Sequence, residues 1–134
     1  MADFKVVRLA ESAIVKFAPD SYYQPLLGDD AGTMPVRTGI QTCLPGYVAA
    51  MHSHPYIEIL HILEGTAEAW VEGEENSKVR LVAGDSIAMP AETPHSFRVV
   101  GDKPMRLLGT HVSPKRIVNY RDGRPTDGRG YRSG

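Results

Sequence analysis

The chain has 134 residues, which is enough for one domain with a buried core. Its 15 lysine and arginine residues nearly balance 16 acidic residues, and the net charge of -1 excludes a broad basic surface for nucleic acid. No apolar stretch reaches the length that crosses a bilayer, the N-terminus lacks a secretory signal pattern, and the single Cys43 excludes an internal disulfide. We therefore expect a cytoplasmic protein that binds neither nucleic acid nor membranes.

Short β-strand candidates, separated by Gly, Pro and Asn turns, follow one another from the N-terminus. In chain order they are residues 4–9, 13–17, 36–44, 47–52, 58–64, 66–72, 78–82, 86–89, 95–100 and 105–112. The stretch 19–35, with its glycines and prolines, is expected to form a loop. No stretch shows a sustained helical period. Many short strands at regular spacing indicate an all-β sandwich or barrel.

Four potential metal ligands lie within this series of strands: His52, His54, Glu58 and His95. Side chains two residues apart on a strand share a face, so His52 and His54 can project together, and Glu58 has the same parity. His95 would approach from a separate strand. Three imidazoles and one carboxylate can hold a divalent transition metal and leave coordination positions open, which is the arrangement of a catalytic rather than a structural site.

The spacing of these residues resembles the first signature motif of the cupin superfamily, which fits at Gly46, His52, His54, Glu58 and Gly65. The resemblance implies a single cupin jelly-roll β-barrel, a type that is often dimeric through its N-terminal strands. Three regions are expected. Residues 1–35 would hold N-terminal strands and a loop, with the role in a homodimer that the resemblance implies, and 36–112 the barrel core. The charge and composition of 113–134 predict a basic, Gly-rich tail that is partly disordered, with 123–134 mobile.

The second cupin motif fits at Gly84, Pro90 and His95 but departs from the family pattern at two positions. Glu92 stands where the family usually has glycine, and Val99 where it usually has asparagine. Glu92 suits the turn if its φ is negative. Val99 removes a hydrogen bond that is often present in the family. Neither departure changes a candidate ligand.

Other polar and aromatic residues are weaker candidates. His111, Tyr47 and Phe97 are candidates to line a substrate pocket, although a surface or interface position is favoured for His111. His61 has the wrong strand parity to join the ligands. Cys43 is not interpreted as a nucleophile, because it shares no motif with the histidines. Of the remaining cations, Arg98 and Arg106 are expected on an exposed strand face.

Several reaction types remain open for such a site. The ligand set accepts Fe, Mn, Ni, Cu, Co or Zn. A redox-active metal favours a dioxygenase, whereas Zn or Mn favours Lewis-acid chemistry such as isomerisation, cyclisation or carbon–carbon cleavage, with Glu58 as a base. The expected substrate is a small organic molecule with a carbonyl, enol or carboxylate handle. An enzyme of dioxygenase type is favoured, and a non-catalytic binding barrel is the third alternative.

Overall fold

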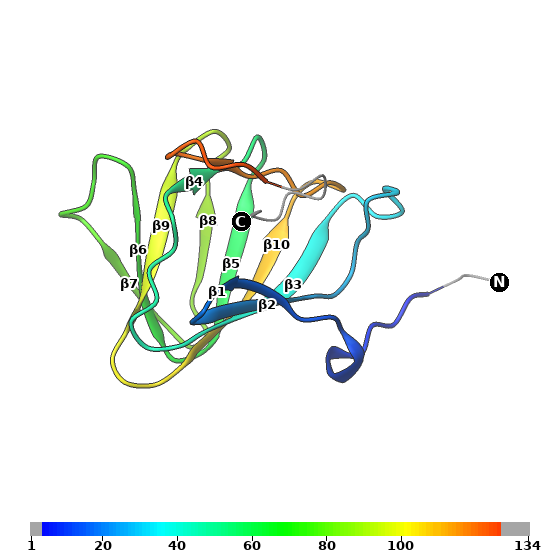
Figure 1. Ribbon diagram of the computed structural model, residues 1–134, viewed down its shortest axis with the longest axis horizontal. Coiled ribbons are helices and arrows are strands. Elements are labelled where there is room, and N and C mark those ends of the chain that lie inside the picture. Colours follow the sequence, from blue (N-terminus) through cyan, green and yellow to red (C-terminus); the bar gives the residue numbers. More distant parts are fainter. Residues whose placement is uncertain (1–3, 127–134) are drawn as a thin grey trace.

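The computed structural model describes residues 4–126, and these residues fold into two antiparallel β-sheets that face each other (Figure 1). The strands are β1 (Val15–Ala18), β2 (Ser21–Pro25), β3 (Arg37–Cys43), β4 (His52–Ser53), β5 (Glu58–Glu64), β6 (Thr66–Val71), β7 (Val79–Val82), β8 (Ser86–Met89), β9 (His95–Val100), β10 (Met105–His111) and β11 (Asn119–Tyr120). The fold is all-β, with two antiparallel sheets in the arrangement of a jelly roll, which confirms the expected class. Within 4–126, no helix is long and apolar enough to span a membrane.

The sheet order joins strands that are far apart in the sequence. One sheet has the order β1-β2-β3-β10-β5-β8 and the other has the order β11-β4-β9-β6-β7. In the first sheet β10 pairs with both β3 and β5, and in the second β9 lies between β4 and β6. Residues that are far apart in the sequence therefore lie on adjacent strands of the same sheet.

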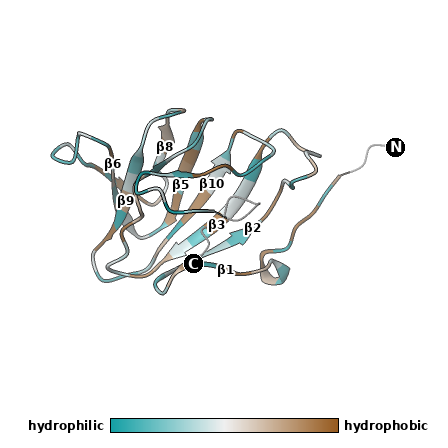
Figure 2. Cartoon of the chain, turned by 45° about the horizontal axis from the view of Figure 1, so that its top comes forward, coloured by the Kyte–Doolittle hydropathy of each residue, from teal (hydrophilic) through white to brown (hydrophobic). Residues whose placement is uncertain are grey.

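The core forms because each strand buries one of its two faces. Along β10 every second residue is buried, from Met105 through Leu107 and Gly109 to His111. Strand β5 alternates in the same way, with Leu60 among its buried residues. Hydropathy colouring shows brown and teal residues on the strands as well as on the loops, with a brown stretch along β5 (Figure 2). This burial of one face per strand supplies most of the folding free energy.

The N-terminal part of the chain differs from the prediction in two places. The predicted strand over 4–9 is wrong, because this segment joins neither sheet; it leads into a 3-10 turn at Leu9–Glu11 and projects from the barrel (Figure 1). The predicted loop over 19–35 is wrong in part, because β2 pairs with β1 and β3. Adjacent β-favouring Tyr22 and Tyr23 explain this strand.

The segment before the first ligand is also less regular than predicted. Of the predicted strand over 47–52, only His52 is assigned to a strand, although Val48 forms an isolated bridge with Arg98. The backbone remains tied to β9, because the Ala49 amide donates to the Phe97 carbonyl at 2.9 Å. Strand β4 is therefore short, but it is held in register with its neighbour.

The C-terminal residues 113–126, called the strap below, cross the open end of the barrel (Figure 1). Strand β11 of the strap pairs with β4, placing Tyr120 opposite His52. Val118 is buried, and the Arg121 amide donates to the Met51 carbonyl at 2.9 Å. The strap therefore forms part of the folded domain. The mobility predicted for 123–134 falls mostly on 127–134, which lie outside the described residues.

Candidate metal centre

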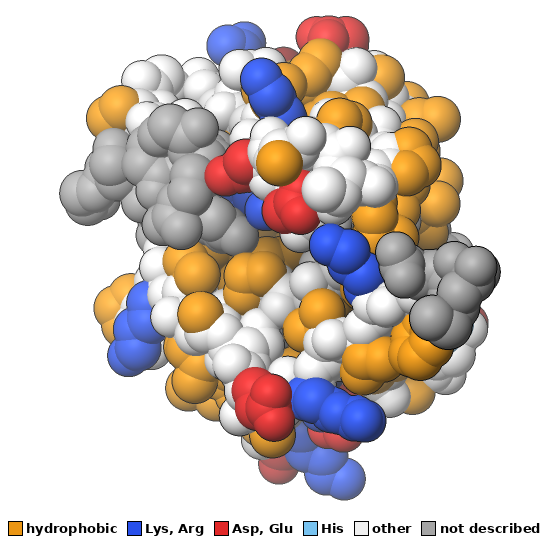
Figure 3. Space-filling model, turned by 90° about the vertical axis from the view of Figure 1, so that its right-hand side faces the viewer, with side chains coloured by type: hydrophobic (Ala, Val, Ile, Leu, Met, Phe, Trp, Pro, Cys, Tyr) orange, Lys and Arg blue, Asp and Glu red, His pale blue; other side chains and the backbone are white. Residues whose placement is uncertain are grey.

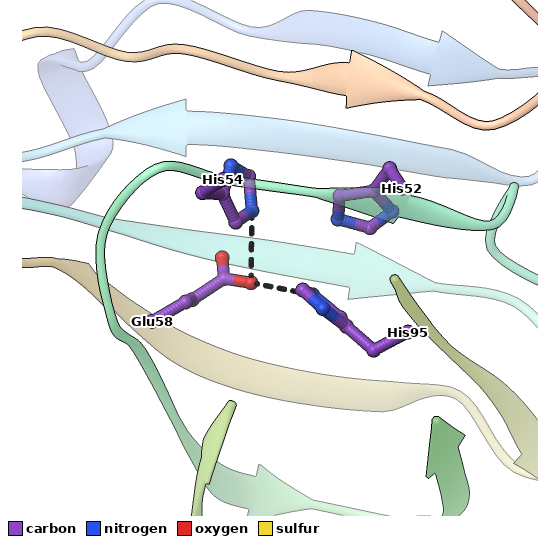
Figure 4. Close-up of side chains that lie close together, drawn as sticks. All are labelled: His52, His54, Glu58 and His95. Atoms are coloured by element: carbon purple, nitrogen blue, oxygen red, sulfur yellow. Dashed lines mark hydrogen bonds and ion pairs between the residues drawn. The ribbon is translucent and has the colours of Figure 1, made fainter. Parts of the chain in front are cut away.

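The four residues selected from the sequence converge at one end of the barrel (Figure 4). His52 lies on β4, His54 follows it, Glu58 begins β5 and His95 begins β9. His52 and His95 are direct partners in the β4–β9 pairing. One ligand atom from each of the four residues lies within 4.8 Å of the others. The two sheets thus fix the separations of all four donors.

Backbone carbonyls orient the three imidazoles. Nδ1 of His52 lies 2.7 Å from the Ala50 carbonyl, and Nδ1 of His95 lies 2.9 Å from the Thr93 carbonyl. Nδ1 of His54 lies 2.6 Å from the carbonyl of Ile117 in the strap. Because a carbonyl only accepts, each Nδ1 carries a proton, and in the neutral ring Nε2 presents its lone pair. This hydrogen bonding is typical of metal-binding histidines.

Burial and neighbouring charges set the ionisation of the cluster. Burial, assisted by His95 and His54, lowers the pKa of His52 to about 3, so its ring is neutral at pH 7. Burial alone would raise the pKa of Glu58, but the charge and hydrogen bond of His111, with hydrogen bonds from His54 and His95, hold it well below its usual value. Glu58 is therefore an ionised carboxylate.

The donor set fits a divalent cation. Oε1 of Glu58 lies 3.2 Å from His54 Nε2 and 3.3 Å from His95 Nε2. Because each Nδ1 carries a proton, Nε2 of either ring can donate to this oxygen only when the ring binds an extra proton, and a divalent cation between these atoms would replace that proton. Three imidazole nitrogens and one carboxylate oxygen are the borderline ligands that Mn, Fe, Co, Ni, Cu and Zn share.

His111 is part of this site, and the surface or interface position favoured for it is wrong. The ring is buried, and its Nε2 lies 2.7 Å from Glu58 Oε2. Its Nδ1 lies 2.5 Å from the Tyr56 hydroxyl, and the Ile117 amide donates to that hydroxyl at 3.1 Å. Burial lowers the pKa of His111, although Glu58 opposes this effect. A chain of hydrogen bonds therefore links Glu58, His111, Tyr56 and the strap.

The pocket beside the cluster has mostly apolar and aromatic walls. Tyr47 and Phe97, selected from the sequence, both line it, with ring centroids 5.8 Å apart. Leu60 and Leu107 also belong to both the pocket wall and the core. The remaining wall residues, from elements the sequence did not connect to the site, include Phe17, Tyr23, Arg116 and Tyr120. Such walls suit a small organic molecule.

The other candidates lie away from the cluster. His61 hydrogen-bonds Ser86 through Nδ1 at 2.6 Å, outside the metal cluster, as its strand parity predicted. Cys43 is buried, and burial raises its pKa to about 12, so the thiol is unreactive. Arg98 is exposed and pairs with Glu68 at 2.6 Å. None of the three contributes to the pocket wall.

The turn before His95 differs from the expectation for Glu92. Its φ is +62°, in the left-handed region, so the negative φ under which Glu92 would suit the turn is not found. The Glu92 amide donates to the His54 carbonyl at 2.7 Å, so the turn joins the two ligand-bearing segments. This bond keeps an unfavourable backbone conformation in place.

The sequence contains a pattern that could have placed His111 at the site, but no pattern that could have placed the strap there. Met105, Leu107 and Gly109 alternate on one face of β10, and His111 continues that face by parity. Arg116 and Tyr120 lie in a segment with little periodicity. Their place at the pocket depends on the β4–β11 pairing, which is not encoded locally.

Comparison with characterised proteins supports the family assignment. Polyketide synthase CurC of Streptomyces cyaneus is 34% identical over 77 residues, covering 57% of this chain and 47% of that protein. The 5-nitrosalicylic acid 1,2-dioxygenase of Bradyrhizobium sp is 34% identical over 73 residues, covering 54% of this chain and 34% of that protein. The alignments thus span less than half the length of these curated relatives.

A solved structure and a family model agree with the observed fold. Oxalate decarboxylase of Bacillus subtilis, studied for its Mn(II) centres, superposes with a TM-score of 0.73 at 19% identity, covering 86% of this chain and 31% of that chain. At this identity the likeness concerns the fold alone. The family model described as Cupin domain matches residues 39–111, which contain all four candidate ligands. The chain therefore belongs to the cupin family.

Proposed function

We propose that this chain is a metal-dependent enzyme of dioxygenase type, acting on a small organic molecule with a carbonyl, enol or carboxylate handle. One observation carries the proposal: His52, His54, His95 and Glu58 converge within 4.8 Å in a pocket with apolar walls. Four protein donors leave one or two positions on a five- or six-coordinate ion, enough for a substrate oxygen and a second small ligand. The similarity to a salicylate-type dioxygenase supports this reaction class.

The residues around the centre have distinct roles in this proposal. Nε2 of the three histidines would bind the ion, and Glu58 would bind through Oε1 while His111 holds Oε2. A bound transition metal would supply Lewis acidity and, if redox-active, electron transfer to dioxygen. The apolar walls would exclude bulk water from the reacting groups. Glu58 Oε1 could also accept a substrate proton if it dissociates from the ion, because His111 keeps the carboxylate in place.

A non-redox reaction is the second candidate, and one specific observation favours it. The hydrogen bonds from Glu58 through His111 to Tyr56 form a path by which a proton can be moved to and from the carboxylate. An isomerase, cyclase or lyase needs such transfer, whereas dioxygen insertion does not. The similarity to a polyketide synthase protein agrees with this alternative.

Elemental analysis tests the metal requirement. Protein purified without chelator or a metal-binding tag is expected to hold close to one transition-metal ion per chain. His52→Ala/His95→Ala is expected to hold less than about a tenth of that, while the control His61→Ala keeps the wild-type content, because His61 lies outside the cluster. Metal-free samples of all three should melt at similar temperatures, since the barrel core does not use the ligands. Protein that neither holds nor takes up metal would contradict the proposal of a metal-dependent enzyme and favour a non-catalytic binding barrel.

Oxygen consumption separates the two reactions. An oxygen electrode would follow metal-loaded protein with candidate enols, diketones, catechols and short 2-oxo acids. Uptake that depends on substrate and disappears in His52→Ala/His95→Ala is expected for a dioxygenase. Substrate conversion without oxygen uptake would reject the dioxygenase and favour the Lewis-acid reaction.

We also infer a homodimer formed through the N-terminal arm, residues 4–14. This arm exposes Phe4, Val6 and Ile14, with Phe4 86% exposed. The side of the molecule from which the arm leaves carries groups of hydrophobic side chains among charged ones (Figure 3). Burial of such side chains between two chains would remove them from water. Light scattering should give twice the chain mass, and Phe4→Asp/Val6→Asp should give the single chain mass; a monomeric wild type would contradict the homodimer.

A further inference from the structure

Gln41 places an amide group in the wall of the pocket that also contains the metal cluster. The residue lies on β3, is 9% exposed, and is the one amide side chain among the described residues that line the pocket. Its neighbours in the sheet are Tyr23 on β2 and Leu107 on β10. A polar group is costly to bury unless it is hydrogen-bonded, so the partners at the two ends of this amide show what the side chain can do.

The nitrogen end of the amide is held by the protein. Gln41 Nε2 donates to Ser21 Oγ at 2.9 Å, and Ser21 Oγ lies 3.5 Å from the Cys43 sulfur. Burial raises the pKa of Cys43, and hydrogen bonds from the Ser21 and Gln41 side chains oppose that rise. Only a hydrogen-bond donor to the sulfur opposes it, so the amide nitrogen, and not the oxygen, faces these two residues. Both contacts fix the orientation of the amide.

The oxygen end of the amide borders the cavity. Gln41 Oε1 has no hydrogen-bond partner within residues 4–126, and protein atoms do not enclose it completely. Because Gln41 lines the pocket and is otherwise buried, the open side of this oxygen is the pocket. A carbonyl oxygen only accepts hydrogen bonds. The pocket therefore presents an acceptor, at a place separate from the metal ligands, to a donor group of any molecule that enters.

Gly109 keeps the cavity open between the metal cluster and Gln41. A Cβ at Gly109 would lie 4.0 Å from Glu58 Oε2 and 3.7 Å from Leu107 Cδ1. The space above this glycine therefore lies between the cluster and Leu107, the neighbour of Gln41 in the sheet. The φ of Gly109 is not positive, so the backbone itself does not require glycine here. A side chain at this position would narrow the passage that joins the two ends of the pocket.

The strand register and the cavity size restrict the length and width of a ligand. His111 lies opposite Glu58, and Leu107, four residues earlier on β10, lies opposite Gln41. These two positions are about 13 Å apart along the strand. Side chains from both positions line the cavity between them, so a chain of a few carbon atoms spans the remaining distance. The cavity holds about 50 Å³, whereas a cavity that admits benzene holds about 150 Å³. A narrow chain therefore fits better than a ring.

We propose, building on the function above, that the substrate is a short aliphatic compound with a hydroxyl group at the end opposite its metal-binding handle, and that Gln41 Oε1 accepts a hydrogen bond from this hydroxyl. A hydroxyl is an uncharged donor, which loses less on leaving water than an ammonium group does. Gln41 is then a residue that determines specificity, because a ligand without the donor leaves Oε1 unpaired in a buried wall.

Nuclear magnetic resonance titrations of zinc-loaded protein test this with pairs of acids that have matched shapes. The probes are straight-chain acids of three, four and five carbons that end in a hydroxyl group, each compared with the acid in which a methyl group replaces that hydroxyl. At one of these lengths, wild type is expected to bind the hydroxy acid about three- to tenfold more tightly than its methyl counterpart. Acetate, which is too short to reach Gln41, measures binding at the metal alone.

Three variants separate hydrogen bonding by Gln41 from a structural role. Gln41→Met keeps the length of the side chain without its carbonyl and should bind both acids of a pair equally, with acetate binding unchanged. The matched control Ser21→Ala removes the partner of the Gln41 nitrogen but leaves Oε1, and should keep the wild-type preference. Gly109→Ala adds a methyl group at ordinary contact distances and should weaken both long acids by about threefold or more while acetate binding is retained.

The remaining outcomes overturn the proposal. Equal binding of both acids at every length would mean that only water binds Oε1, and a preference that persists in Gln41→Met would place the hydroxyl elsewhere. Equal loss of the preference in Ser21→Ala and Gln41→Met would show that Gln41 only supports the wall. If Gln41→Met does not fold, wild-type binding of the long acids by Gly109→Ala rejects the route to Gln41. Absence of zinc and acetate binding would reject the metal centre as well, whereas acetate binding without a hydroxyl preference rejects only the role of Gln41.

Discussion

The strand-borne ligands and the strap meet at the same pocket but are held in different ways. His52, Glu58 and His95 begin strands whose ladders fix their positions. The strap is held by a two-residue strand, the buried Val118 and a few hydrogen bonds to Met51, His54 and Tyr56. A sheet tolerates little change in register, whereas a strap tolerates substitution. The difference predicts that metal binding depends more on the barrel strands than on the strap, and the predictions below test this in order of expected effect.

The largest effect should come from the strand side, at His111. His111→Gln removes the ring that holds Glu58 Oε2 at 2.7 Å, and metal affinity should fall by about 10- to 100-fold. Competition with a fluorescent chelator measures this directly. Arg116→Gln is the matched control from the strap, and its metal affinity should equal that of wild type. An equal loss of metal affinity in both variants would show that the strap and the strands contribute equally to metal binding.

The metal-free ligand cluster should make stability depend on pH. The pKa of His52 is about 3 in the folded state, below its value in the unfolded chain, so the unfolded chain binds more protons as the pH falls. Stability is therefore full above about pH 6.5 and is lost as the pH falls toward 3. From pH 7 to pH 5 the loss assigned to His52 should be about 1–2 kcal/mol. Urea unfolding of wild type and His52→Gln measures it, and equal pH slopes would contradict this origin.

A smaller effect should appear where the two regions join, at Tyr56. Tyr56→Phe removes the hydroxyl that contacts His111 and accepts the Ile117 amide, at a cost of about 1 kcal/mol. Hydrogen exchange of the Ile117 amide should become faster, while metal content stays at the wild-type level. Loss of metal in this variant would show that the strap contributes to the ligand cluster itself.

The smallest effect should come from the turn that leads to His95. Glu92→Gly relieves a non-glycine residue with φ of +62° and should raise the free energy of unfolding by about 0.5–1 kcal/mol. The neighbouring control Ala91→Gly, where φ is not positive, should lower it by a similar amount. Thermal melts compare the two variants, and stabilisation by both would rule out relief of backbone strain.

The sequence by itself determined the features that depend on local periodicity and motif spacing. Turn residues at regular spacing, with β-favouring residues between them, predicted β5, β6 and β10 closely, because these signals are local and need no knowledge of the partner strand. The spacing of His52, His54 and Glu58 selected the cluster for the same reason, since residues of equal parity share a face. The family followed from these two regularities.

Only the tertiary structure decided what depends on long-range pairing. His111 reaches Glu58 because β10 pairs with β5 in one particular register, with these two residues opposite each other. Arg116 and Tyr120 reach the pocket because β11 pairs with β4, a contact between segments more than sixty residues apart. Such pairings form when the whole barrel closes. A short stretch of sequence does not specify which distant strand it will pair with. The four candidate metal ligands, with Tyr47 and Phe97 of the pocket wall, could therefore be selected from the sequence, whereas Arg116 and Tyr120 of the same wall could not.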